Sequence, residues 1–381
     1  MPAPAKTESP TLNWLPISVF SITGLITLTL VPYYALTHGF DGWQIAALLT
    51  GIAFCEISIT AGYHRLWSHR SYQAHWAVRL FFALGGTYAT QNSILHWSSD
   101  HRQHHLCVDD NDKDPYSAKR GFWYSHMGWM LRDYGSNPNS NYENCKDLQK
   151  DPIVMWQHKH YLPLVLGINF GIPILLGLWH GDLIGMILLA GVARLAISHH
   201  MTFFINSLAH IWGSQPYSDT NTSRDNAVIA FLTMGEGYHN YHHNFQRDYR
   251  NGIRWWQFDP TKWLIRGLNL VGLTTKLYRT PSENIEREHA QMLLQNTSRS
   301  LALSPFYKPM TLRLQEEYQL LTEKINAFSV AKKEWLLARK KSVMTNSDLQ
   351  TLRSKVHRLK KDFRQQKKSW VSINARIALS T

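Results

Sequence analysis

The sequence is poor in cysteine and in charge. Its 381 residues include three cysteines, Cys55, Cys107 and Cys145, with no two close together. This excludes a disulfide framework and a zinc site built on thiolates. Only 18% of the residues are charged and 44% are hydrophobic, whereas roughly a quarter of an average soluble domain is charged. A disordered chain is therefore excluded.

Acidic residues are scarce as well. The chain has 27 Asp and Glu against 40 Lys and Arg, a formal net charge of +13. Residues 282–381 alone contain 19 of the basic and 9 of the acidic residues. A nucleic-acid-binding protein usually spreads Lys and Arg over the folded surface that meets the phosphates. We therefore expect no nucleic-acid partner.

Long apolar stretches are what the sequence has instead. Four of them are long enough to cross a hydrocarbon core of roughly 30 Å as helices, over residues 15–34, 42–63, 161–179 and 183–204. A fifth, residues 80–95, is short for a span and predicts an interfacial helix. The loops at 35–41 and 180–182 lack Lys and Arg, whereas residues 64–160 contain eleven. The positive-inside rule then places the middle block and both termini in the cytosol.

These features predict an all-α membrane protein: four transmembrane helices under a cytosolic helical cap, in a membrane domain over residues 1–281. Residues 282–304 are expected to be a linker. Apolar residues repeat with spacings of three and four over residues 314–335 and 349–377, which predicts a basic, coiled-coil-like helical hairpin over 305–381. Ser347 and Gln350 predict a capping box at its second helix.

The hairpin carries most of the basic excess. Cationic amphipathic helices can lie on anionic lipid or attract an acidic electron carrier. The alternative is a solvated hairpin that only covers the cap.

Histidine is abundant, with 20 residues, and eight of them fall into three clusters. Imidazole is the commonest metal ligand in proteins. In two clusters the histidines stand at positions i, i+3 and i+4, which puts three imidazoles on one side of a helix where they can converge on a metal. The candidate ligands are His64, His69, His101, His104, His105, His239, His242 and His243.

The clusters predict two metal ions. One such cluster is often a chance surface arrangement, but three in one chain favour a site. Eight imidazoles without a thiolate are too many for one tetrahedral zinc, and imidazole suits iron, zinc and copper. A dinuclear iron site can activate dioxygen and break an unactivated C–H bond, which no side chain does alone. Beside a membrane, lipid is the natural substrate.

Around these histidines the sequence resembles the membrane fatty acyl desaturases, of the delta-9 stearoyl-CoA type. The resemblance covers residues 43–278 and rests on 60–72 (TAGYHRLWSHRSY), 114–115 (DP), 120–122 (RGF), 125–126 (SH), 206–210 (NSLAH) and 235–243 (GEGYHNYHH). It implies that nine histidines, with His210 as the ninth, bind two iron ions, and that Asn206 holds a water on one of them. It also implies that dioxygen is used to introduce a cis double bond into a saturated long-chain acyl group, in unsaturated fatty acid biosynthesis.

The resemblance implies substrate contacts too. The positions that bend the acyl chain beside the metals correspond to Gln91, Trp97 and Thr202. The positions that bind the phosphates of a fatty acyl-CoA correspond to Asp100, Lys119 and Arg120.

Two residues depart from the family pattern. Ser99 stands where the animal enzymes have Arg, which leaves a lipid-bound or carrier-protein-bound acyl group open. Glu56 puts a carboxyl group in the second span, where it is costly unless paired or near water, so the chain length of the substrate stays open. Because no flavin motif, cytochrome b5 domain or CxxC pair is present, we expect an external electron donor of the ferredoxin, rubredoxin or cytochrome b5 type.

Two other functions remain open at this point. A di-iron hydroxylase of the alkane monooxygenase kind shares the metal chemistry, but its histidine clusters are spaced differently. A membrane metal-binding scaffold, with the hairpin recruiting partners, would need no catalysis. The product mass separates the two enzymes, and one zinc without iron would favour the scaffold.

Overall fold

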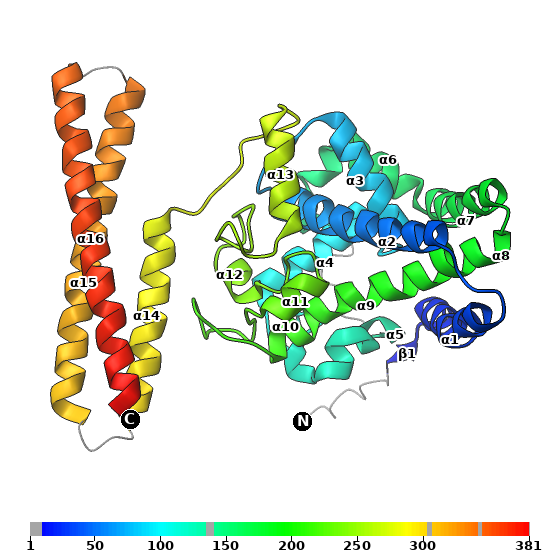
Figure 1. The fold of residues 1–381 in the computed structure, drawn as a ribbon, viewed down its shortest axis with the longest axis horizontal. Coiled ribbons are helices and arrows are strands. Elements are labelled where there is room, and N and C mark those ends of the chain that lie inside the picture. Colours follow the sequence, from blue (N-terminus) through cyan, green and yellow to red (C-terminus); the bar gives the residue numbers. More distant parts are fainter. Residues whose placement is uncertain (1–9, 135–140, 303–306, 342–344, 381) are drawn as a thin grey trace, which may run out of the picture. The chain divides into compact units, whose positions relative to one another are not determined.

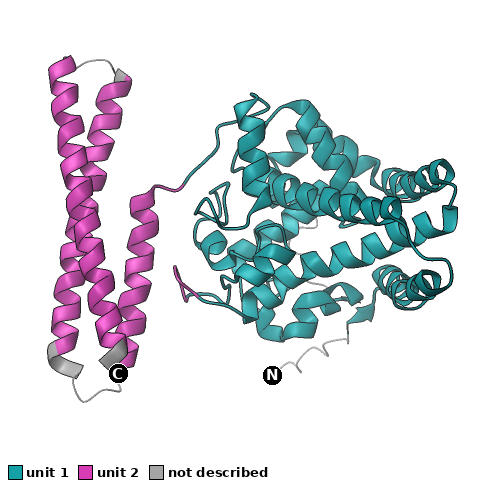
Figure 2. Cartoon of the chain, in the orientation of Figure 1, with its two compact units in different colours: residues 1–214, 220–279 teal, residues 215–219, 280–381 magenta. Residues whose placement is uncertain are grey.

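The fold is helical, as Figure 1 shows for this computed structural model, which describes residues 10–134, 141–302, 307–341 and 345–380. The chain divides into two compact units (Figure 2). Unit 1 comprises residues 1–214 and 220–279, and unit 2 comprises residues 215–219 and 280–381.

Among the residues that the structure describes, unit 1 has four helical segments of membrane-spanning length, which confirms the all-α membrane fold. The first and third are α1 (Trp14–Thr37) and α7 (Tyr161–His180). The second joins α2 (Gly42–Ile57) to the π-helix η1 (Ser58–Ser68). The fourth runs through α8 (Leu183–Met186), η6 (Ile187–Ala193), α9 (Arg194–Asn206) and α10 (Leu208–Ile211).

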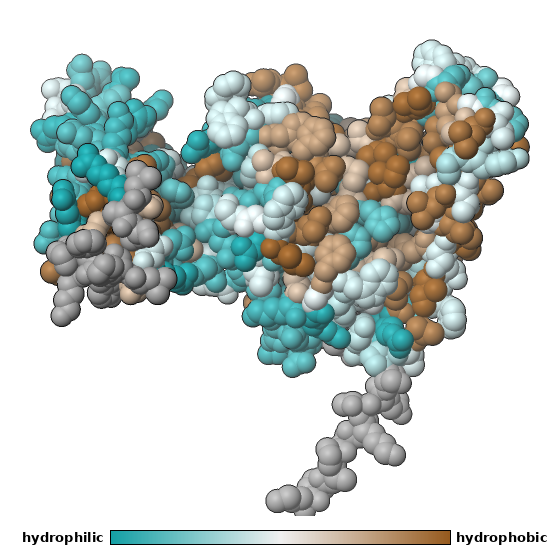
Figure 3. All heavy atoms as spheres, turned by 60° about the horizontal axis from the view of Figure 1, so that its bottom comes forward, coloured by the Kyte–Doolittle hydropathy of each residue, from teal (hydrophilic) through white to brown (hydrophobic). Residues whose placement is uncertain are grey.

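The outer surface of these segments is apolar. Figure 3 shows hydrophobic side chains gathered over unit 1, and large exposed apolar residues include Leu28, Leu49, Phe170 and Leu178. Such a surface is stable only against lipid or another apolar surface.

The second and fourth segments are longer than a span needs. They contain 27 and 29 residues, or roughly 40 Å each at 1.5 Å per residue, against a hydrocarbon core of roughly 30 Å. Each segment is therefore long enough to extend beyond the hydrocarbon. His64 lies near the end of the second segment and His210 near the end of the fourth.

The predicted interfacial helix at 80–95 is wrong in its bounds. The structure has α3 (Trp76–Tyr88), a break, and then α4 (Ile94–Cys107). The break contains Thr90 and Asn92, whose φ angles are +55° and +73°. The α3 helix has 13 residues, about 20 Å at 1.5 Å per residue, which is too short to cross the hydrocarbon core.

Short elements complete the cap of unit 1. The helices are η2 (Ala118–Arg120), η3 (Tyr124–Gly128), α5 (Trp129–Leu131), η4 (Glu143–Cys145), η5 (Leu148–Lys150), α6 (Pro152–Lys159), α11 (Ala227–Leu232), α12 (His239–Asn244) and α13 (Pro260–Leu270). Two antiparallel strand pairs join β1 (Thr11–Leu12) to β3 (Arg132–Asp133) and β2 (Gln73–Ala74) to β4 (Thr274–Thr275).

The described residues of unit 2 form three helices, α14 (Ser282–Leu301), α15 (Tyr307–Lys341) and α16 (Asn346–Ser380). The linker expected at 282–304 is therefore wrong for residues 282–301. Ala290 and Leu301 of α14 join the core that the other two helices form around Phe328 and Trp370.

The start of α16 also differs from the prediction. The Thr345 hydroxyl accepts a hydrogen bond from the Asp348 backbone N–H at 3.2 Å and donates one to the Asp348 carboxylate at 2.7 Å. The cap is thus Thr345, and Ser347 already lies inside the helix.

Candidate metal centre

All nine predicted histidine ligands come together in unit 1. They are carried by the end of the second spanning segment, by α4, by α10 at the end of the fourth segment, and by α12. They divide into a group of five, His64, His69, His101, His105 and His242, and a group of four, His104, His210, His239 and His243. Within each group the ring nitrogens lie within 4.8 Å of one another.

The Nε2 atoms face inward. The His64 and His242 Nε2 atoms are 3.0 Å apart, and those of His69 and His101 are 2.8 Å apart. In the second group, the His239 Nε2 atom is 3.1 Å from both the His210 and the His243 Nε2 atoms. Each group thus presents a set of converging nitrogens.

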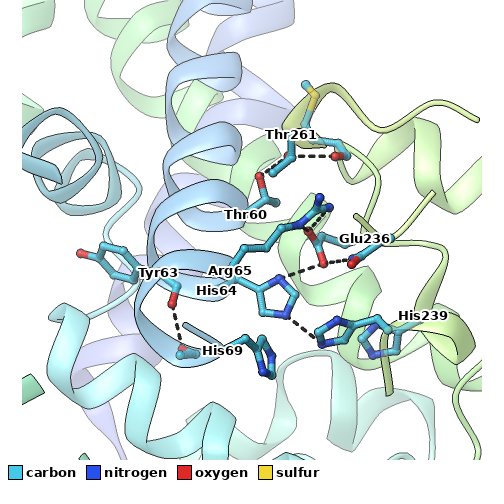
Figure 4. Close-up of polar contacts among 12 residues, drawn as sticks. Thr60, Tyr63, His64, Arg65, His69, Glu236, His239 and Thr261 are labelled. Atoms are coloured by element: carbon cyan, nitrogen blue, oxygen red, sulfur yellow. Dashed lines mark hydrogen bonds and ion pairs between the residues drawn. The ribbon is translucent and has the colours of Figure 1, made fainter. Parts of the chain in front are cut away.

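Several Nδ1 atoms face outward to fixed oxygen partners. His64 Nδ1 lies 3.0 Å from a Glu236 carboxylate oxygen (Figure 4), and His104 Nδ1 lies 2.8 Å from Asp114 Oδ1. A carboxylate favours the proton on the facing Nδ1 atom: His104 donates it to Asp114, whereas His64 faces Glu236 without forming a well-shaped hydrogen bond. The Nε2 lone pair is then left free to bind a metal, the arrangement usual for metal-binding histidines.

Two further histidines are held by hydroxyl groups. His210 Nδ1 lies 2.9 Å from Thr222 Oγ1, and the Thr222 hydroxyl in turn donates to Asp109 at 2.6 Å. His101 Nδ1 lies 3.3 Å from the Tyr116 hydroxyl. Ligands from both groups are thus held from outside as well as by their own helices.

The electrostatics keep the rings neutral. Burial, followed by the nearby cationic side chains and imidazoles, lowers the pKa of His69, His101, His105, His242 and His243 well below the ordinary value. Burial also lowers the pKa of His239, to about 3. At neutral pH these rings are uncharged and can donate lone pairs.

Glu236 links the site to a buried ion network. Its carboxylate accepts hydrogen bonds from Arg65 Nη2 at 2.8 Å and from Asn251 at 2.6 Å. Arg65 also pairs with Asp259 at 3.1 Å. Burial would raise the pKa of Glu236, but His64 and Arg65 lower it to about 2, so Glu236 is ionised at neutral pH.

This donor set fits two metal ions. Where Nδ1 donates outward, as in His104 and His210, no proton is left on the inward Nε2 atom, so its lone pair faces the neighbouring Nε2 atoms and is available to a cation between them. Two clusters of neutral imidazoles suit iron, copper or zinc.

The residues expected at the bend of the acyl chain lie beside the histidines. Trp97 stacks on His101, with ring centroids 4.8 Å apart. The Gln91 amide donates a hydrogen bond of 2.8 Å to the Thr202 hydroxyl. Thr202 is one helical turn before Asn206, which is half-buried at the end of α9.

The residues expected to bind phosphate are more open. Lys119 and Arg120 are exposed on η2, and the Arg120 guanidinium lies 3.7 Å from the Tyr124 ring centroid. Asp100 is half-buried, with a carboxylate oxygen 3.3 Å from His96 Nε2.

The two departures from the family pattern are both buried. Ser99 donates a hydrogen bond of 2.8 Å to the Asn144 side chain. Glu56 is fully buried; its carboxyl group lies against the Thr202 hydroxyl without forming a well-shaped hydrogen bond.

Sequence reasoning assigned no role to the outer partners Glu236, Asp114, Asp109, Thr222 and Tyr116. Two of them stand in segments that carry the resemblance, Asp114 before Pro115 and Glu236 within GEG. The presence of a carboxylate in such a segment was the sequence signal that could have identified Asp114 and Glu236 as partners of the ligands. The contacts of Asp109 and Thr222 join positions 113 residues apart, so no local pattern could find them.

Comparison with known proteins identifies the family. Residues 41–272 match the family model described as "Fatty acid desaturase". The "Probable acyl-CoA desaturase" of Schizosaccharomyces pombe is 45% identical over 278 residues, 72% of this chain and 57% of the relative. "Acyl-CoA desaturase 1" of Saccharomyces cerevisiae is 48% identical over 282 residues, 72% of this chain and 53% of the relative.

A human relative is covered more fully. "Stearoyl-CoA desaturase 5" of Homo sapiens is 38% identical over 241 residues, 62% of this chain and 72% of the relative. The chain spans little more than half the length of the two yeast relatives.

Proposed function

Because the chain belongs to the fatty acid desaturase family, we propose that it is an oxygen-dependent acyl-CoA desaturase of the stearoyl-CoA type. It introduces a cis double bond at the delta-9 position of a saturated long-chain acyl group. One dioxygen, two electrons and two protons are consumed, and two waters are released as two hydrogens leave the chain. The observation that carries this proposal is the convergence of nine histidines in two groups at the ends of spanning helices.

Two iron ions would occupy the two histidine groups, and Asn206 would hold a water on one of them. When bound, the irons supply the activation of dioxygen. The protein's own residues set the geometry: Glu236 and Asp114 hold His64 and His104 in the orientation that points Nε2 inward. Catalysis needs no residue beyond this centre and its supports.

The acyl chain lies beside the metal centre in this proposal. The Gln91–Thr202 hydrogen bond fixes the bend of its path, and Trp97 closes the path against His101. The exposed cations Lys119 and Arg120 suit the phosphates of coenzyme A, and Asp100 contributes to the same contact.

Electrons come from a separate carrier of the ferredoxin, rubredoxin or cytochrome b5 type. The metal centre and both termini face the cytosol, and α3 does not cross the bilayer. A cysteine introduced at Lys113 should be labelled by an impermeant reagent from the opposite side to a cysteine in the 179–182 loop. Labelling of both from one side would contradict this topology.

The test of function uses the purified chain, loaded with iron and supplied with an electron donor, dioxygen and stearoyl-CoA. We expect a product lighter by two hydrogens, with a cis double bond at the delta-9 position. His104→Ala should be inactive, and His160→Ala, an exposed histidine outside both groups, should stay active. A product that gains one oxygen would identify a hydroxylase. One zinc without iron and no turnover would identify a metal-binding scaffold.

A further inference from the structure

The α16 helix carries a row of unpaired cations on its outer side. Residues 346–380 contain nine Lys and Arg against two Asp. Eight of the nine cations are exposed, and five of these form what we call the cationic face: Arg353, Lys360, Lys361, Arg364 and Lys368.

The spacing puts this face on a side of α16 that is turned away from the core of unit 2. Arg353, Lys360, Arg364 and Lys368 follow one another by seven, four and four residues, which aligns them along one side of a helix. The core positions of α16 include Phe363 and Trp370. At 100° per residue, Phe363 and Trp370 lie on average about 95° and about 115° around the helix from this row.

None of the five cations forms an ion pair or a hydrogen bond within the described parts of the chain. The acidic partners of α16 lie on its flanks. Glu286 pairs with Lys367, and Glu334 pairs with Lys355. The charge of the cationic face is therefore available to an external anion.

The cationic face fits a flat, diffuse layer of negative charge. Its row runs 15 residues, about 22 Å along the helix. Its described residues include no exposed Phe, Tyr or Trp, and Val371 is its one large apolar residue. A specific protein interface is usually anchored by aromatic residues in pockets.

The covalent connection of unit 2 to the membrane-spanning unit favours lipid as the partner of the cationic face. Unit 2 follows Arg279 directly in a chain with four membrane-length helices, so a bilayer is always within its reach. A tethered contact has a high effective concentration and needs little affinity of its own. The matched family segment ends at residue 272, so this surface lies beyond it.

We propose that the cationic face of α16 docks on anionic lipid headgroups of the membrane that holds the spanning helices. Each Lys or Arg near an anionic surface strengthens binding roughly fivefold. The contact holds the unit flat against the leaflet, and it weakens as salt rises.

The test follows the position of α16 in the full chain. A fluorophore is placed at Val371→Cys on the row, with Cys107→Ser to remove the one native cysteine that is not buried. The protein is reconstituted in nanodiscs containing a lipid with a quencher on its headgroup, made with phosphatidylcholine alone or mixed with phosphatidylserine. We expect strong quenching only with phosphatidylserine, and its loss when salt rises from about 0.1 M to about 1 M.

Charge reversal supplies the second arm. Lys360→Glu, Arg364→Glu and Lys368→Glu together should weaken docking by at least about a hundredfold and abolish quenching.

The matched control reverses three exposed cations of α15, Arg313→Glu, Lys333→Glu and Lys340→Glu. It changes the net charge equally but should keep the quenching.

Three results would overturn the proposal. The first is equal quenching in both lipid mixtures. The second is a loss of quenching in the α15 control variant equal to that in the α16 variant. The third is a label that is shielded only when an acidic electron carrier is added. The last result would assign the face to a protein partner. The readout needs no turnover, so it stands or falls separately from the desaturase activity.

Discussion

Replacing Glu236 by Gln isolates the contact that orients His64. The change keeps the shape of the side chain but removes the charge that lies 3.0 Å from His64 Nδ1 and 2.8 Å from Arg65 Nη2. Losing an outer partner of a metal ligand typically weakens metal binding about 10–100-fold, or roughly 1.4–2.7 kcal/mol. We expect Glu236→Gln to fall in this range, measured as iron affinity by competition with a chelator.

The same change should lower the stability of the fold. Removing one partner of a buried ion pair costs about 3–5 kcal/mol. Because Arg65 keeps Asp259 at 3.1 Å, we expect a smaller loss in the free energy of unfolding, about 2–3 kcal/mol.

Asp259→Asn is the matched control. Asp259 binds the same Arg65 and also accepts from the Lys262 backbone N–H at the start of α13, but His64 is outside its reach. It should destabilise the protein at least as much as Glu236→Gln while leaving iron affinity unchanged. If both variants lose iron equally, or if Glu236→Gln binds iron normally, the orienting role of Glu236 is refuted.

Substitutions at five further positions test the site and its surroundings. Metal analysis should find less iron in His104→Ala and in His242→Ala, one ligand from each group, and desaturation should be abolished in both. Asn206→Ala should lose little iron but most of its turnover, because a water-mediated contact tunes a metal more than it holds it. Glu56→Ala should change the preference between palmitoyl-CoA and stearoyl-CoA, measured by product profiling, while Glu56→Gln should keep it. Asp225→Asn should flatten the pH dependence of stability.

The histidine ligands could be predicted from spacing, but their division into two groups could not. His104 and His105 are neighbours in sequence, yet His104 joins His210 and His105 joins His242. Successive residues of a helix point about 100° apart, so each can face a different metal. Which partner meets each ring is decided by the packing of α4 against α10 and α12, contacts over more than 100 residues of sequence.

The break between α3 and α4 had one local signal, Ser93, whose hydroxyl accepts a hydrogen bond of 3.3 Å from the His96 backbone N–H as the N-cap of α4. The break is stabilised from the fourth spanning segment: Arg194 donates to the Tyr88 carbonyl at 2.6 Å, and His199 Nε2 lies 3.0 Å from the Ala89 carbonyl. These side chains satisfy backbone groups that would otherwise be left open where the helix ends. The sequence therefore predicted one continuous apolar segment over 80–95, because the residues that end α3 lie over 100 positions away.

The role of α14 was missed for a different reason. Its apolar positions, such as Ala290 and Leu301, are less regular than those of the hairpin, and Glu283 and Glu286 make it look solvated. In the structure these carboxylates pair with Lys332 of α15 and Lys367 of α16. Charge pairing between helices made a packed helix resemble a linker.

Asp225 contacts α12, the helix that carries His239, His242 and His243, and its titration should change the stability of the fold with pH. Its Oδ1 atom accepts a hydrogen bond of 3.0 Å from the Tyr241 backbone N–H in α12, and no cation pairs with it among the described residues. Burial is the main cause that raises the pKa of Asp225, to about 7, whereas an Asp in an unfolded chain has a pKa of roughly 3.9.

The folded pKa lies above the unfolded one, so the contribution of Asp225 to stability is full below about pH 4 and is lost as pH rises to about 7. The full difference between the folded and unfolded pKa values of Asp225 corresponds to a free energy of at most about 4 kcal/mol. The partial exposure of the side chain reduces the expected contribution to stability to about 1–2 kcal/mol. Asp225→Asn keeps the acceptor oxygen and removes the titration. This titration spans about pH 4 to pH 8. As the pH rises through this range, the free energy of unfolding of the metal-free variant should therefore fall less than that of the unchanged metal-free protein. Metal-free protein is used because metal release at low pH would add its own slope, and the remaining histidine titrations are common to both proteins. Parallel stability profiles for the two proteins would show that Asp225 is ionised throughout, and that its burial costs less than the structure indicates.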